Sequence, residues 1–235
     1  MTKNNMINAE DLSVKLQAFL DQAVKQADLR QRVLIDGELY LEIQANYNRF
    51  CEIKDPHALC CFCLMYSAYY GLRNLELKNE NKARVLTAYA DKLLEPAENN
   101  EDCFESTLRR LSRETGRKEV SYSSKLAATR NSSLPVIDRH VKHVLEISAI
   151  PTSSVDKWLE IYGQIKERYE ALEKIPLANG KFFEDCFDEL WPNLKGMTLV
   201  KKADHIVWEI GKEDERVNRQ RKKKAKEATN EKTVL

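Results

Sequence analysis

The chain has 235 residues with only seven glycines and six prolines, which suits one large domain or two small lobes with few turns. Its formal net charge is +1, but this balance hides a strong segregation of charge along the chain. No run of about 18 apolar residues without a charge occurs, and a helical membrane span would need such a run.

The composition favours α-helix over β-strand. Leu, Ala, Glu, Lys and Arg are abundant, and these are good helix formers. No stretch alternates apolar and polar residues between turn signals as a half-buried strand does. We therefore predict an all-α fold.

Apolar spacing and capping residues predict helices in the first half of the chain. Gly37 predicts a break between the first two, and Asp55 followed by proline is a typical helix start. The third helix is apolar on nearly every side, so we expect it to be the most buried helix of the domain. The expected ranges are 10–28, 38–50, 55–71 and 81–95.

The second half predicts further helices of the same kind. Gly116 is expected to end one of them, and Asp138 is expected to begin another. A loop over 131–135 separates two of these helices. The expected ranges are 102–115, 123–130, 138–148, 151–174, 180–190 and 198–210.

The end of the chain differs in charge from the rest. Residues 216–226 hold seven basic residues and no acidic one, which leaves 31 basic against 37 acidic residues elsewhere. We divide the chain into a helical domain over 1–211, of one body or two lobes, and a charged tail over 212–235. We expect the tail to be disordered or a frayed helix. It is a candidate contact for a protein or nucleic-acid partner, and solvated charge is the simpler interpretation.

Cysteine and histidine residues do not predict a metal site. We expect reduced thiols in a cytoplasmic protein, because no secretion signal is recognisable. Cys60, Cys61 and Cys63 share one apolar helix, where neighbouring side chains diverge, so we interpret them as core residues. His140 and His143 are one helical turn apart without a further suggestive ligand, and we interpret them as polar helix-face residues. We predict no metal and no cofactor.

The most informative pattern lies within residues 121–145. Ser121-Tyr-Ser-Ser-Lys-Leu-Ala127 is followed by Leu134-Pro-Val-Ile-Asp-Arg-His-Val-Lys-His-Val-Leu145. Together, these two segments resemble the active-site segment of the helix-hairpin-helix DNA glycosylases. Lysine-bearing members typically read Gly-Val-Gly-Thr-Lys-Val-Ala, followed by Pro-Ile-Leu-Asp-x-x-Val-x-x-Val-Leu. Lys125 stands at the position of the hairpin lysine, and Asp138 stands at the position of the aspartate.

The resemblance implies a two-lobed helical fold and a DNA glycosylase or abasic-site lyase. It implies that Lys125 is the nucleophile that attacks C1′ of a flipped nucleotide. It also implies that Asp138 stabilises the positive charge that develops on the sugar. A helix start favours the ionised carboxylate, although capping alone is the commonest role of an aspartate at that place.

The charge of this region suits double-stranded DNA as the partner. Residues 105–145 carry nine lysines or arginines against four acidic residues, and a local positive face can bind phosphates on an otherwise acidic protein. A DNA partner would place the protein at the nucleoid. The expected phosphate contacts are Arg109, Arg110, Arg113, Arg117, Lys118, Ser121 and Ser123.

The pattern departs from the family in three respects. Ser121 and Ser123 replace the hairpin glycines, which let backbone N–H groups approach a phosphate closely. Lys125 and Asp138 are separated by thirteen positions, which is shorter than expected for lysine-bearing members. The family's cysteine-rich iron–sulfur motif near the C-terminus is absent. Two hypotheses therefore stay open: a DNA glycosylase/lyase, and a non-catalytic DNA-binding or protein-interaction module that retains the fold.

Overall fold

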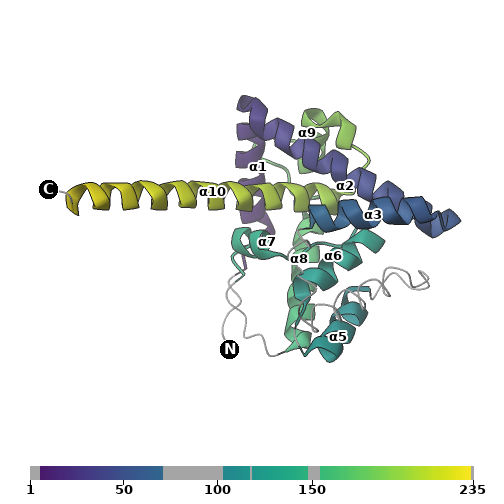
Figure 1. Ribbon diagram of the computed structural model, residues 1–235. Helices are drawn as coiled ribbons and strands as arrows, with labels where there is room; N and C mark the ends of the chain where they lie inside the picture. The colour runs from purple at the N-terminus through teal and green to yellow at the C-terminus, as the bar shows by residue number, and fades with distance from the viewer. Residues whose placement is uncertain (1–5, 71–102, 117, 148–153, 234–235) are drawn as a thin grey trace.

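The computed structural model describes residues 6–70, 103–116, 118–147 and 154–233 of the chain, and these ranges are mostly helical (Figure 1). Within them, the extended pairing is limited to one isolated bridge between Pro176 and Phe182. The predicted all-α fold is confirmed for this part of the chain. None of the helices described there combines the length and the apolarity that crossing a membrane requires. The predicted helix over 81–95 lies outside the described residues.

The helix bounds follow the predicted pattern closely at several capped starts. Asn8 Oδ1 accepts a hydrogen bond from the Asp11 N–H at 2.7 Å, and Asp55 caps the helix that begins at Pro56. The described elements are α1 (Ala9–Lys25), α2 (Ala27–Ile53), α3 (Pro56–Tyr69), α5 (Cys103–Thr115), α6 (Val120–Arg130), α7 (Arg139–Val144), α8 (Val155–Ala171), α9 (Phe183–Leu190), the 3-10 turn η2 (Pro192–Leu194) and α10 (Leu199–Thr233).

Most buried apolar side chains belong to one core. It joins α1, the first half of α2, α5 and α7 to α8, α9 and the first half of α10. One face of α8 is buried in this core and carries Trp158, Ile161, Tyr162, Ile165 and Tyr169, and Leu172 is buried just after the helix. A smaller cluster links the second half of α2 to α3 and α6 through Tyr47, Phe62 and Leu126.

The prediction that α3 is the most buried helix is wrong. Ala58, Phe62 and Tyr66 are its buried residues, and they form one stripe along the helix. The side that carries Leu64 is exposed, and so are the three cysteines that were expected in the core, Cys60, Cys61 and Cys63. The helix packs mainly on α2. Because a single neighbouring helix can cover only one face, the other side of α3 is left exposed. Apolarity all round therefore does not place α3 at the centre.

Gly37, where a break between helices was predicted, and Gly211, the last residue of the predicted helical domain, both lie inside helices. α2 runs through Gly37, and α10 runs through Gly211. A Cβ atom at Gly37 would collide with the Leu194 side chain, and one at Gly211 would lie 2.7 Å from His140 Cβ. Each glycine therefore permits a close helix contact. Gly116 behaves as predicted, because it ends α5 with a φ of +67°.

The charged end of the chain continues α10. Of the two states expected for residues 212–235, the structure describes a helix that reaches Thr233 and projects away from the body (Figure 1). Its first turns still contact the body: Lys212 pairs with Asp36 at 3.1 Å, and Glu213 pairs with Arg32 at 3.3 Å. The boundary placed after Gly211 therefore does not coincide with the edge of the packed body.

Candidate active site

A cavity of about 570 Å³ opens where α2, α6, α7, α10 and the end of α3 meet. Each of these elements contributes side chains to the lining, so residues far apart in sequence face one space. Lys125 on α6 and Asp138 at the start of α7 both belong to the lining. The two residues singled out from the sequence as a catalytic pair therefore lie at the same cavity.

Asp138 is the N-cap of α7. Its Oδ1 accepts hydrogen bonds from the N–H groups of His140 at 2.8 Å and Val141 at 3.0 Å, as a short polar side chain at a helix start commonly does. Among the described residues, no donor forms a hydrogen bond with Oδ2. One carboxylate oxygen thus holds the helix start, while the other is left for the cavity.

Lys125 is partly buried in the second turn of α6. Its Nζ donates a hydrogen bond to the carbonyl oxygen of Tyr70 at 3.2 Å and lies 5.3 Å from the centre of the Tyr70 ring. Burial lowers the pKa of the Lys125 ammonium, and the negative charge of Asp138 acts in the opposite direction. Compared with an exposed lysine, a larger share of this amine is neutral at a given pH.

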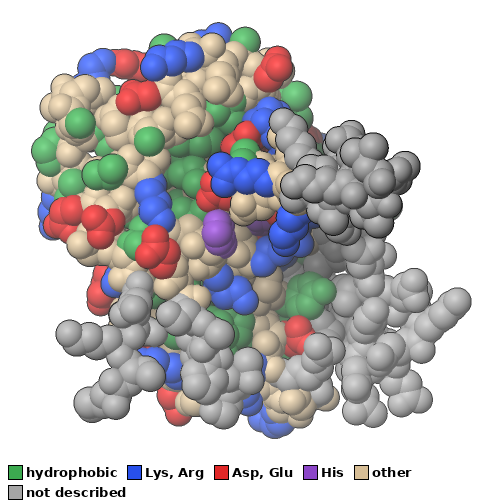
Figure 2. All heavy atoms as spheres, turned by 90° about the vertical axis from the view of Figure 1, so that its left-hand side faces the viewer, with side chains coloured by type: hydrophobic (Ala, Val, Ile, Leu, Met, Phe, Trp, Pro, Cys, Tyr) green, Lys and Arg blue, Asp and Glu red, His purple; other side chains and the backbone are tan. Residues whose placement is uncertain are grey.

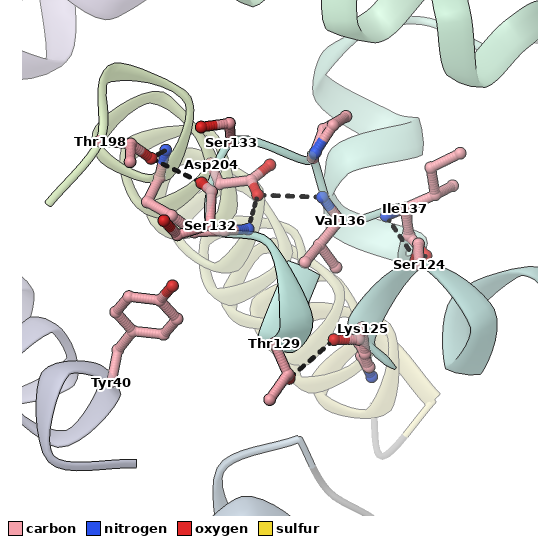
Figure 3. A network of polar contacts seen from close by, with 12 residues as sticks. Tyr40, Ser124, Lys125, Thr129, Ser132, Ser133, Val136, Ile137, Thr198 and Asp204 are labelled. Atoms are coloured by element: carbon pink, nitrogen blue, oxygen red, sulfur yellow. Dashed lines mark hydrogen bonds and ion pairs between the residues drawn. The ribbon is translucent and has the colours of Figure 1, made fainter. Parts of the chain in front are cut away.

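The segment 135–137, just before Asp138, is held by side chains of three helices. Figure 3 shows the contacts of Asp204 and Ser124. The bonds join Asp204 Oδ2 to the Val136 N–H at 2.9 Å, Ser124 Oγ to the Ile137 N–H at 2.9 Å, and the Tyr162 hydroxyl to the Pro135 carbonyl at 3.0 Å. These bonds fix the backbone that leads into α7. The position of Asp138 relative to α6 is therefore set by buried polar contacts as well as by its own cap.

Aromatic side chains form one wall of the cavity. Tyr40, Tyr69, Tyr70 and Trp208 belong to the lining. Tyr69 and Tyr70 meet edge to face with ring centres 4.8 Å apart, and the ring centres of Tyr69 and Trp208 are 6.2 Å apart. Rings arranged in this way can hold a planar aromatic ligand by stacking or edge contacts.

Buried polar groups of α10 line the cavity beside this wall. Lys201 Nζ lies 2.6 Å from Asp204 Oδ2, and both side chains are almost fully buried. Burial raises the pKa of the Asp204 carboxyl, and the Lys201 charge opposes that shift. Burial also lowers the pKa of His205 to about 4, so its imidazole is neutral near pH 7. These three residues add polar recognition without a large net charge.

The predicted phosphate contacts around α5 are not part of this cavity. Arg109 forms ion pairs with two carboxylates, at 2.6 Å and 2.7 Å, and Arg110 pairs with a third at 2.9 Å. Arg113 and Lys118 also lie outside the lining. Arg117 lies outside the described residues.

The structure places other cations at the cavity. Arg139 and Lys142, the first and last residues of the first turn of α7, belong to the lining. Arg139 is 71% exposed and pairs with Glu215 of α10 at 3.2 Å. Lys142 Nζ lies 5.8 Å from the centre of the Trp158 ring. Both residues follow Asp138 in the sequence pattern, but whether they line the cavity depends on how α7 packs against α10.

The two serines that replace the hairpin glycines have different positions. Both lie in the first turns of α6, because this helix begins at Val120, three residues earlier than predicted. Ser121 lines the cavity. Ser123 is buried, and both its N–H and its hydroxyl donate to the Glu119 carbonyl at 2.9 Å. Ser123 thus has no group free for a phosphate in this conformation.

The two histidines of α7 separate in the structure. His140 is buried beside Trp208, whereas His143 is exposed and lies 3.2 Å from Asp214. Within the described part of the chain, no group of three or more histidine, cysteine or acidic side chains is placed to hold a metal ion. Of the two histidines, His140 belongs to the cavity lining and His143 does not.

Sequence reasoning missed most of the residues that complete the cavity. The aromatic wall comes from α2, α3 and α10, and no short motif joins these helices. The stretch from Lys201 to Trp208 was predicted only as part of a helix over 198–210. Its repeat of lining residues every three or four positions is the signal that could have indicated a second role. The lining residues of this helix are Lys201, Asp204, His205 and Trp208.

Comparisons with known proteins gave no match to a family model, to a curated protein or to a solved structure.

Proposed function

We propose that this chain is a DNA glycosylase with lyase activity that acts on damaged or abasic DNA. The supporting observation is that Lys125 and Asp138 line one cavity, where burial lowers the pKa of the lysine. A partly desolvated amine beside a carboxylate is the arrangement that imine-forming catalysis on a sugar requires.

Lys125 is the nucleophile in this mechanism. Its neutral Nζ adds to C1′ of the deoxyribose as the bond to the damaged base breaks, and the departing base takes the electron pair and a proton. At an abasic site the amine instead adds to the C1′ aldehyde and loses water to form an imine. The Tyr70 carbonyl, 3.2 Å from Nζ, orients the amine before attack.

Asp138 stabilises the positive charge that develops on the sugar. Its Oδ1 is fixed by the two N–H groups of the α7 start, so its Oδ2 is the oxygen that faces the reacting sugar. The bonds that fix residues 135–137 keep this carboxylate in place. A preorganised charge requires no rearrangement during the reaction.

The cavity suits one flipped nucleotide. Its volume of about 570 Å³ lies within the range of small-molecule sites, which is about 300–1,000 Å³. The tyrosine and tryptophan rings offer a stacking surface for the base, as enzymes that flip a base commonly do. Arg139 and Lys142 at the lining provide positive charge for the adjoining phosphates.

Borohydride trapping tests this proposal directly. Wild-type protein is mixed with duplexes that carry a panel of damaged bases or an abasic site, and borohydride reduces any imine to a stable adduct. We expect an adduct with wild type and none with Lys125→Gln. Lys142→Gln is the matched control, because Lys142 lines the same cavity but is not the proposed nucleophile, and it should still trap.

Replacing Asp138 by asparagine tests the role of its negative charge separately from its role as the N-cap of α7. Asparagine caps helices about as well as aspartate, so Asp138→Asn should change stability by less than about 1 kcal/mol. Trapping should nevertheless become slower by orders of magnitude, because the carboxylate charge is gone. The proposal fails if Lys125→Gln traps at the wild-type rate, or if wild type traps on no lesion of the panel.

A non-catalytic DNA-binding or protein-interaction module is the second candidate function. It is favoured by the continuous helix at the positions of the hairpin glycines, where Ser123 is buried. In such a module Asp138 would serve only as the cap of α7. Duplex binding without trapping on any lesion would favour this candidate over the enzyme.

A further inference from the structure

One stripe of α10 lines the cavity. Lys201, His205 and Trp208 belong to the lining, and their spacing of four and then three residues places them on one side of the helix. The next residue of this stripe is Lys212, whose Nζ lies 4.0 Å from the centre of the Trp208 ring. The stripe thus leaves the cavity without a break.

The same spacing carries the stripe beyond the packed body. Glu215 and Arg219 follow Lys212 at intervals of three and four residues, and Lys222 and Lys223 follow Arg219. Glu215 pairs with Arg139 at the cavity and also with Arg219. This carboxylate joins a cavity residue to the first basic residue of the stripe farther out on α10.

The outer part of α10 is basic and exposed. Arg216, Arg219, Arg221, Lys222 and Lys223 are all exposed, and no acidic residue occurs over 216–226. Figure 2 views the molecule from the side toward which α10 projects in Figure 1, and lysine and arginine side chains lie there around a histidine, with acidic side chains among them. The rest of the chain has more acidic than basic residues, so this projection stands out as positive.

We propose that the outer part of this stripe, from Arg219 to Lys223, binds the phosphate backbone of duplex DNA beside the nucleotide that occupies the cavity. The inference rests on the proposed function, because it takes the cavity as the place of a nucleotide. A helix rises about 1.5 Å per residue, so Lys223 lies about 22 Å along α10 from Trp208. At about 3.4 Å per base pair, the stripe reaches phosphates six or seven base pairs from that nucleotide.

The composition of the outer helix favours duplex DNA over other partners. From Arg216 to Lys223 the one apolar residue is Val217. A membrane-surface helix needs an apolar face to insert, and a helix that docks into a protein groove needs apolar anchors. Charge alone is sufficient for binding to a phosphate backbone.

Matched double variants test the proposal. Arg219→Gln with Lys223→Gln removes one arginine and one lysine from the stripe. Arg221→Gln with Lys224→Gln removes the same two residue types at helix positions that do not follow the spacing of the stripe. Binding of a 25-base-pair duplex with a central abasic analogue is measured by fluorescence anisotropy over a range of salt concentrations.

The stripe variant should lose two phosphate contacts. The slope of log affinity against log salt should then fall by about 1.8, which weakens binding on the order of tens-fold at 0.1 M salt. The control variant should keep nearly the wild-type slope. Shortening the duplex to about four base pairs on each side of the lesion should make wild type and the stripe variant equal.

The outcomes separate this inference from the proposed function. Equal slopes of log affinity against log salt for the two double variants would refute the role of the stripe in DNA binding, whatever the trapping experiment shows. A stripe effect on phosphatidylserine vesicles but not on duplexes would overturn it as well. If the stripe variant lowers the salt slope of duplex binding but Lys125 forms no adduct on any lesion, the DNA-binding role of the stripe is supported and the catalytic proposal is refuted.

Discussion

A single methyl group at Gly211 should separate two helices on which the site depends. In the structure, a Cβ atom there would lie 2.7 Å from His140 Cβ, 3.0 Å from its Cα and 3.1 Å from its carbonyl oxygen. Two of these three atoms belong to the backbone of α7, so a side-chain rotation cannot relieve the overlap. Gly211→Ala must therefore push α10 away from α7, the helix that Asp138 begins.

The net effect combines a steric cost with a helix-propensity gain. Forcing an extra carbon into a packed contact costs about 1–3 kcal/mol, and alanine in place of glycine inside a helix gains up to about 1 kcal/mol. We expect Gly211→Ala to destabilise the protein by roughly 1–2 kcal/mol. For a chain of this length, that corresponds to a decrease in Tm of about 2–8 °C.

Gly163 in α8 is the matched control. A Cβ atom there would meet nothing within 4 Å, so Gly163→Ala should raise stability by about 0.5–1 kcal/mol. Urea unfolding followed by circular dichroism measures both variants. The two substitutions should shift the midpoint in opposite directions. Equal stabilisation by both would refute the close contact between α10 and α7, and with it the geometry of this side of the cavity.

Three further predictions concern the cavity and α10. The rate of trapping by Lys125 should increase with pH as the amine loses its proton. Asp138→Asn should move the midpoint of this pH profile to lower pH, because the carboxylate raises the lysine pKa. An unchanged midpoint would contradict the coupling between the two residues. The pKa of His205 near 4 lies below its ordinary value near 6.5, so stability should be complete above pH 6.5 and decrease toward pH 4. By linkage the loss at pH 5 is about 2 kcal/mol, and His205→Leu should remove this part of the acid sensitivity in urea unfolding. Truncation after Gly211 should cost about 2–4 kcal/mol because it leaves the buried Glu209 without Lys212, whereas truncation after Val217 should leave the thermal midpoint nearly unchanged.

Local signals in the sequence determined much of the helical framework. Capping residues such as Asn8, Asp55 and Asp138 act through hydrogen bonds to N–H groups only two or three residues away. Such contacts can be predicted from spacing alone. The fold class and most described helix starts were therefore predictable, and the resemblance singled out Lys125 and Asp138, which line one cavity.

The errors concern contacts between distant segments. Glycine ends helices when a left-handed conformation is needed, as at Gly116, but at Gly37 and Gly211 it makes room for Leu194 and His140. Both uses look alike in a single sequence. In the same way, the apolar composition of α3 could not reveal how many neighbours would cover it.

The buried polar contacts around Asp138 bear on the choice between an enzyme and a binding module. A helix cap needs only the short bonds from Asp138 to the two N–H groups of α7. It does not require that Lys125 be drawn out of solvent toward the Tyr70 carbonyl, or that residues 135–137 be fixed by side chains of three helices. Burial of a lysine costs free energy, which the buried Lys201 offsets through its ion pair with Asp204, whereas the hydrogen bond of Lys125 goes to a neutral carbonyl. The amine and the carboxylate at one cavity are the observation on which the proposal of chemistry on a bound sugar rests.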